Sequence, residues 1–151
     1  MKQSLPLKIL IELAQAEVDD ATRRLGTLQQ QRNDAQRQLD ALTQYRDEYR
    51  KRLTQDAQGG IDAANWRNFQ QFIDTLDVAM SQQRSAVDAS EARLHTGRLD
   101  WQTRKQKLSS FETLQDRAQQ RENLRLARIE QRESDEFAAK SSRLRGQLNF
   151  E

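Results

Sequence analysis

The chain has 151 residues, of which 35% are hydrophobic and 32% are charged, with a formal net charge of +2. This composition is too polar for a large globular core but suits helices that each bury one narrow apolar stripe. The absence of cysteine excludes a disulfide framework and a thiolate metal site. No apolar run is long enough to span a bilayer.

A first helix is predicted over residues 5–56. Pro6 marks its start, because proline is tolerated in the first helical turn. Lys8 interrupts the apolar opening, so we interpret residues 5–11 as the start of the helix and not as a secretion signal. Apolar residues then recur in steps of three and four, which predicts a coiled-coil seam. The seam comprises Leu7, Ile11, Ala14, Val18, Ala21, Leu25, Leu28, Ala35, Leu39, Leu42, Tyr49 and Leu53, with Arg32 and Arg46 at two of its positions.

A turn is predicted over residues 57–62. Gly59 and Gly60 supply the positive φ that ends a helix, and Asp62 is a plausible cap for the next one.

A second helix is predicted over residues 63–145. Its apolar repeat comprises Trp66, Phe69, Ile73, Leu76, Met80, Val87, Leu94, Trp101, Leu108 and Phe111. Gly97 lies on this seam, where it allows a close helix approach or marks a bend. The seam fades after residue 111, so residues 114–151 overhang the first helix, and we expect them to be disordered when free.

These elements predict an all-α fold, an antiparallel two-helix coiled-coil hairpin with a long C-terminal overhang. Folding at the glycine pair sets opposite each other positions whose numbers add to about 119, with a register error of a few residues. Leu53 then meets Trp66, and Leu39 meets Met80.

Nothing in the sequence indicates catalysis. The single histidine, His95, is predicted to face solvent, and the carboxylates are scattered. The glycine pair lacks the Lys and Ser/Thr of a phosphate-binding loop, and no metal-ligand spacing occurs. We therefore expect no enzyme activity, no cofactor and no metal.

Two other features remain open between a structural and a functional interpretation. Near the turn, Tyr45 and Phe72 lie one position off the seam, so they form either an aromatic flank of the seam or a docking patch. On the overhang, five arginines share one helix face and form either a solvated surface or a site for an acidic groove. They are Arg117, Arg121, Arg125, Arg128 and Arg132.

The chain resembles the FliJ family of the bacterial flagellar type III export apparatus. The resemblance rests on the hairpin, the position of its turn, and an aromatic and leucine cluster. It implies a fold similar to the rotary-ATPase γ stalk and a surface that binds the export gate. That surface would comprise Gln38, Leu42, Tyr45, Tyr49, Phe72, Leu76 and Ala79, with Gln83 at a position where the family pattern leads us to expect histidine.

The resemblance also implies a set of partners. They are the export ATPase FliI, its regulator FliH, the cytoplasmic domain of the gate protein FlhA, and the export chaperones FlgN and FliT. The ATPase-binding end is placed by geometry at Lys8, Arg23 and Arg24 together with the five overhang arginines.

The leading hypothesis is a non-enzymatic, cytoplasmic coupling and chaperone-escort factor, peripherally associated with the inner-membrane export apparatus and monomeric when free. Three alternatives remain: a stalk protein of a virulence injectisome, a generic coiled-coil spacer or chaperone, and a nucleic-acid-binding rod. The last predicts an affinity that falls steeply with salt.

Overall fold

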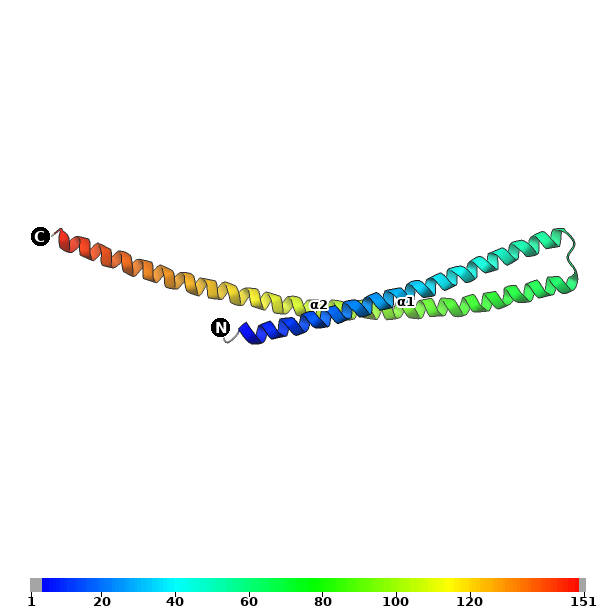
Figure 1. Cartoon of the computed structure of the whole chain (residues 1–151), viewed down its shortest axis with the longest axis horizontal. Coiled ribbons are helices and arrows are strands. Elements are labelled where there is room, and N and C mark those ends of the chain that lie inside the picture. The colour runs from blue at the N-terminus through cyan, green and yellow to red at the C-terminus, as the bar shows by residue number, and fades with distance from the viewer. Residues whose placement is uncertain (1–3, 150–151) are drawn as a thin grey trace. The chain divides into compact units, whose positions relative to one another are not determined.

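The computed structural model describes residues 4–149 and contains two helices, α1 (Ser4–Gln58) and α2 (Ala63–Leu148), joined by a short turn (Figure 1). No strand occurs among the described residues. The two helices pack together as an antiparallel hairpin, which confirms the predicted all-α fold class.

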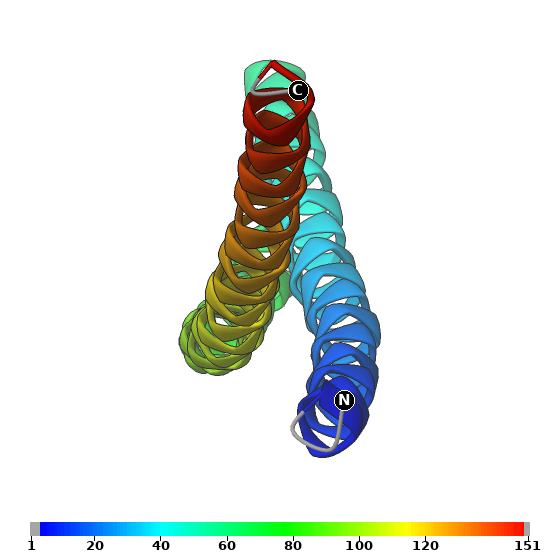
Figure 2. The ribbon, with the colours of Figure 1, turned by 90° about the vertical axis from the view of Figure 1, so that its left-hand side faces the viewer.

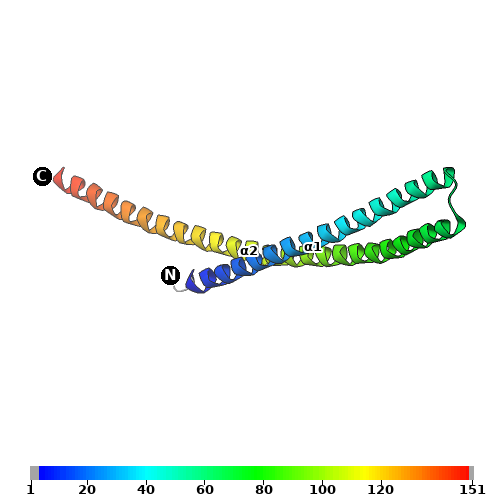
Figure 3. The same ribbon diagram turned by 45° about the vertical axis from the view of Figure 1, so that its right-hand side comes forward.

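The chain divides into two compact units. The hairpin unit comprises residues 16–105 and contains the turn; the terminal unit comprises the described parts of residues 1–15 and 106–151. Figure 3 shows the two helices of the hairpin unit running side by side to the turn.

The turn is built by backbone hydrogen bonds around the glycine pair. The Gly59 amide donates to the carbonyls of Gln55 (3.3 Å) and Asp56 (3.2 Å), which ends α1. Gly60 has φ +84°, a left-handed value that favours glycine. The Asp62 carbonyl accepts the first intrahelical hydrogen bond of α2, from Trp66 N–H at 3.0 Å, as an N-cap residue does.

One heptad stripe of α2 forms most of the core of the hairpin unit. Ile73, Met80, Val87 and Leu94 follow one another at seven-residue intervals, and all four are buried. Val18, Ala21 and Leu53 are the buried apolar residues of α1 in this unit. Each fully buried Val, Leu, Ile or Met side chain contributes about 1.5–3 kcal/mol, so this narrow seam is the main source of stability.

The other stripe of α2 becomes polar in the middle of the hairpin unit. Gln83 donates through Nε2 to the Ala35 carbonyl of α1 at 2.9 Å. Ser90 is buried, and its hydroxyl donates to the Ala86 carbonyl one turn earlier. The sequence pattern missed Ser90 because a serine is counted as polar although its small side chain fits a seam position.

Gly97 continues this stripe and allows a close approach of the two helices. A Cβ atom at this position would lie 2.6 Å from Leu28 Cδ1 and 3.7 Å from Leu25 Cδ1. Residue 97 is helical, as are its neighbours on both sides. The structure therefore favours a close helix approach at Gly97 over a bend.

The seam arginines of α1 pair with acids of α2. Arg32 Nε lies 3.6 Å from Glu91 Oε1, and Arg46 NH1 lies 3.7 Å from Asp77 Oδ1. The Nε atoms of both arginines are buried without a hydrogen-bond partner. Such positions lower stability but fix the register of a coiled coil.

The observed register follows from the true ends of the helices. Residues 58 and 63 flank the turn, so facing positions have numbers that add to about 121. Trp101 Nε1 donates to Thr22 Oγ1 at 3.0 Å, and these two residue numbers add to 123. Gln83 donates to the Ala35 carbonyl, and these two numbers add to 118, so the two pairs lie on either side of 121. The predicted value of 119 lies within its stated tolerance. Trp66, however, is 43% exposed, so its assignment as a buried seam residue is wrong.

The buried core of the terminal unit is small and lies around residues 14 and 108. Ala14 of α1 and Leu108 of α2 occupy facing register positions, and both are almost completely buried. From residue 112 to 149 every residue is exposed except Ser141, which is half-buried. Figure 2 shows this C-terminal part of α2 in yellow to red. No described helix covers this part of α2, so we still expect it to be disordered in the free protein.

Candidate partner-binding surfaces

An aromatic cluster bridges α1 and α2 near the turn. The ring centroids of Tyr49 and Phe72 are 4.4 Å apart with an interplanar angle of 43°. Phe69 adds a second ring, 6.3 Å from Tyr49. Contacts of this kind contribute about 0.5–1.5 kcal/mol beyond area burial, so the cluster stabilises the helix pair as well as offering a surface.

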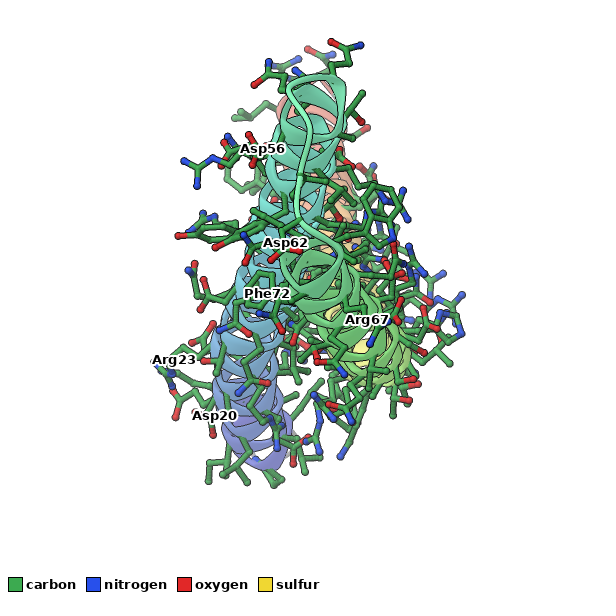
Figure 4. All side chains as sticks on the ribbon, turned by 90° about the vertical axis from the view of Figure 1, so that its right-hand side faces the viewer. Asp20, Arg23, Asp56, Asp62, Arg67 and Phe72 are labelled. Carbon is green, nitrogen blue, oxygen red and sulfur yellow. The ribbon has the colours of Figure 1, made fainter. Side chains whose placement is uncertain are left out.

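The outer members of this cluster are open to a partner. Tyr45 is 57% exposed and Phe72 is 41% exposed, as expected for residues one position off the seam. Figure 4 looks from the turn along the helices and labels Phe72 on α2. Gln38 is also exposed, and Leu42 is half-buried. An apolar surface of this type, with two aromatic side chains, is typical of protein interaction sites.

Three residues of the predicted gate-binding set lie deeper. Leu76 is buried in the seam, so it supports the surface from beneath. Ala79 and Gln83 are half-buried, and the Gln83 amide is held by its bond to the Ala35 carbonyl. The surface open to a partner is therefore centred on Tyr45 and Phe72.

Two features of this region were not predicted from the sequence. The guanidinium carbon of Arg52 lies 5.9 Å from the Tyr49 ring centroid, within cation–π range. Trp66, Leu53 and Ala57 line a hollow beside the turn. The signal for Arg52 was its position three residues after Tyr49, on the neighbouring turn of the same helix face.

Arg23 and Arg24, both predicted to bind the ATPase, form ion pairs. Arg23 NH2 lies 2.5 Å from Asp20 Oδ1, and the two side chains project together from α1 (Figure 4). The hydrogen bond from Arg23 lowers the pKa of Asp20, and the same bond raises the pKa of Arg23. Arg24 NH2 lies 3.6 Å from Asp100 Oδ2 of α2.

The overhang arginines are gathered on one side of α2. Four of them surround a hollow of about 390 Å³ whose apolar lining is Leu124 and Ile129. The four are Arg121, Arg125, Arg128 and Arg132. Arg117 lines the next hollow toward the N-terminus of α2.

One member of this arginine group is paired with an acid. Arg125 NH2 lies 2.6 Å from Glu122 Oε1, three residues earlier. The hydrogen bond lowers the pKa of Glu122 and raises the pKa of Arg125. Lys8, the remaining predicted ATPase contact, is exposed on α1 of the same terminal unit.

Among residues 4–149, no group of three or more His, Cys, Asp or Glu side chains is arranged to hold a metal ion. Neither described helix contains a stretch with the length and hydropathy needed to cross a membrane.

Comparison with known proteins identifies the family. The family model described as flagellar FliJ protein matches residues 2–147. The chain belongs to the FliJ family. A flagellar FliJ protein of Salmonella typhi is 37% identical over 142 residues, which cover 94% of this chain and 97% of the relative. The flagellar FliJ protein of Escherichia coli K12 is 36% identical over 136 residues, which cover 90% of this chain and 92% of the relative.

The match to FliJ extends over both helices and the turn. Both relatives are described as flagellar proteins, which favours a flagellar role over the injectisome alternative. Family membership makes the chain a component of flagellar protein export.

Proposed function

We propose that this chain is a non-enzymatic coupling factor that links the flagellar export ATPase to the membrane export gate and escorts export chaperones. In this role it associates peripherally with the inner-membrane export apparatus. Membership of the FliJ family supports the export role. The observation that carries the coupling role is the exposed pair Tyr45 and Phe72, which lies in a different unit of the chain from the arginine group of the overhang.

The gate would bind at the aromatic surface. Tyr45 offers an exposed ring, and Phe72 is backed by its contact with Tyr49 at 4.4 Å. A rigid aromatic side chain loses little conformational entropy on binding, so a few such residues account for most of an interface's affinity. The proposed partner is the cytoplasmic domain of the gate protein.

The ATPase would bind at the basic surface of the terminal unit. Arg121, Arg128 and Arg132 lie on one side of α2, where they would meet an acidic groove. Contacts between exposed charges are screened by salt and act mainly on association rate. The affinity for the ATPase should therefore fall as the salt concentration rises.

The gate contact is tested with the double variant Tyr45→Ala/Phe72→Ala and the purified cytoplasmic domain of the gate protein. We expect at least about a tenfold loss of affinity, since two central aromatic residues each typically contribute more than 1 kcal/mol. The matched control is Val78→Ala, which removes an exposed apolar side chain from the same unit. Unchanged binding by the double variant, or an equal loss in the control, contradicts the proposal.

The ATPase contact is tested with Arg121→Glu/Arg128→Glu/Arg132→Glu. We expect this variant to lose stimulation of ring formation and hydrolysis by the cognate export ATPase. Arg98→Glu, a charge reversal at an exposed position of the hairpin unit, serves as the control and should retain stimulation. An active triple variant would return the arginine group to an ordinary solvated surface.

A further inference from the structure

Two arginines of the α1 seam each meet one acid of α2. Arg32 Nε lies 3.6 Å from Glu91 Oε1, and Arg46 NH1 lies 3.7 Å from Asp77 Oδ1. In each pair the two residue numbers add to 123, so both pairs belong to the same register. All four residues lie in the hairpin unit. The seam is therefore held by ion pairs at two places, two heptads apart.

A heptad repeat alone does not select this register. Sliding one helix along the other by seven residues returns every seam position to an equivalent neighbour, so an apolar stripe allows the slide in either direction. The slide would change the sum of facing residue numbers from 123 to 116 or to 130. Only side chains that break the repeat can distinguish these three registers.

The two seam arginines disfavour both slides. At a sum of 116, Arg32 would face Arg84, and Arg46 would face the uncharged Gln70. At a sum of 130, Arg32 would face Arg98, and Arg46 would face Arg84. Each slide thus replaces two contacts between opposite charges by at least one contact between like charges, which is unfavourable. Neither slide gives either arginine an acidic partner.

A third arginine, outside the seam, favours the same register. Arg24 NH2 lies 3.6 Å from Asp100 Oδ2, and their numbers add to 124. A slide by seven residues would bring Arg24 opposite Arg93 in one direction and opposite Lys107 in the other. Three arginines of α1 therefore meet acids in the observed register, and none of them would meet an acid after either slide.

The register also decides whether the aromatic surface is complete. Tyr49 of α1 contacts Phe72 of α2 with ring centroids 4.4 Å apart, and their numbers add to 121. A slide by one heptad moves the helices by about 10 Å along their axis. Phe72 would then face Leu42 or Asp56 in place of Tyr49. Because both helices contribute to the surface, it is complete in one register only.

We propose that Arg32 and Arg46 are positioning residues for partner binding: they hold the hairpin unit in the single register that keeps Tyr49 against Phe72. Neither arginine needs to touch the partner. The buried Nε atoms of both lower the stability of the seam, so their contribution lies in selecting the register. The binding step rests on the gate contact proposed above, whereas the register is a property of the chain alone.

The register is measured with spin labels on the full chain. The chain contains no cysteine, so Gln44→Cys/Ala89→Cys supplies the only attachment points, and both positions are exposed in the hairpin unit. In the observed register they lie about 18 Å apart along the axis, and a slide changes this separation by about 10 Å in either direction. Double electron–electron resonance should give one distance when both arginines are present.

Arg32→Glu/Arg46→Glu provides the decisive comparison. It sets acid against acid in the observed register, whereas the slide to a sum of 130 sets the substituted positions against Arg98 and Arg84. A second distance should become the main one, and affinity for the purified cytoplasmic domain of the gate protein should fall about tenfold, as expected when the binding register drops to about a tenth.

Two matched variants accompany this charge reversal. Arg37→Glu/Lys51→Glu has the same net charge and changes exposed residues on the outer side of α1, so it should keep one distance and full affinity. Adding Asp77→Arg/Glu91→Arg to the charge-reversed chain restores opposite charges in the observed register. This exchange should return both the original distance and the original affinity.

Arg32→Leu/Arg46→Leu separates positioning from stability. Removing two charged groups from the seam should raise the midpoint of urea unfolding, while a second distance appears and gate affinity falls. A residue that only supported the fold could not give higher stability together with weaker binding. A single unchanged distance in the glutamate and leucine variants, or unchanged affinity in a changed register, overturns the proposal. An unsubstituted chain that does not bind the gate domain contradicts the gate contact instead, and the distances then still decide the register.

Discussion

The close approach of the helices at Gly97 makes a quantitative prediction. Replacing a glycine in a helix interior by alanine stabilises the helix by about 1 kcal/mol through backbone entropy. Gly26 provides the matched reference, because a Cβ there would meet nothing within 4 Å. Gly26→Ala should therefore raise the free energy of unfolding by nearly the full amount.

At Gly97 the same gain is opposed by a contact. The new Cβ would lie 2.6 Å from Leu28 Cδ1, so that side chain must move. Leu28 borders a hollow of about 560 Å³, also lined by Ala21 and Ala92, which gives it room to turn. A displaced rotamer costs about 0.5–1.5 kcal/mol. We therefore expect Gly97→Ala to leave the free energy of unfolding within about 0.5 kcal/mol of the wild type.

A double-mutant cycle isolates the contact. In a Leu28→Ala background the obstructing methyl is absent, so Gly97→Ala should recover a stabilisation of about 1 kcal/mol. Urea unfolding followed by circular dichroism at 222 nm measures all four variants. Equal stabilisation of the wild type by Gly97→Ala and Gly26→Ala would contradict the close approach, because the two helices would then not be in contact at residue 97.

Three further predictions concern the ion pairs and the overhang. Arg46→Leu should raise the free energy of urea unfolding by about 1 kcal/mol, because it removes a buried Nε without a hydrogen-bond partner. A lower free energy of unfolding would mean that the ion pairs of Arg46 contribute more than the cost of burying its guanidinium. Because the pKa of Asp20 is lowered, its stabilising bond is present above the ordinary value of 3.8 and is lost as pH falls through the lowered one; Arg23→Gln should raise the NMR titration midpoint of Asp20, and an unmoved midpoint would count against the bond. Amide hydrogens of residues 112–148 should exchange much faster than those of residues 70–104, because no partner covers them; equal protection would refute the expected disorder of the free overhang.

The heptad pattern predicted the fold because a two-helix coiled coil depends on little else. Seven-residue spacing from Ile73 to Leu94 predicted the buried stripe of α2, and the glycine pair located the turn. The register differed by about two positions, because α1 continues to Gln58 and moves the centre of the turn. Trp66 consequently lies beside the end of α1 with much of its ring exposed, an effect that no periodicity could show.

The candidate surfaces were predictable in composition but not in detail. The positions of Tyr45 and Phe72, one step off the seam, predicted their exposure, which the structure confirms. The bond from Gln83 to the Ala35 carbonyl depends on the interhelical distance, which the sequence does not specify. The burial of Ser90 was missed because serine is counted as polar, although its small side chain fits a seam position.

A two-helix hairpin has no interior beyond its seam, and this explains where its binding surfaces arise. Any apolar side chain off the seam stays exposed, and exposed aromatic side chains that lie close together are candidates for partner binding. Tyr45 and Phe72 meet this criterion in the hairpin unit, where Tyr45 is 57% and Phe72 is 41% exposed.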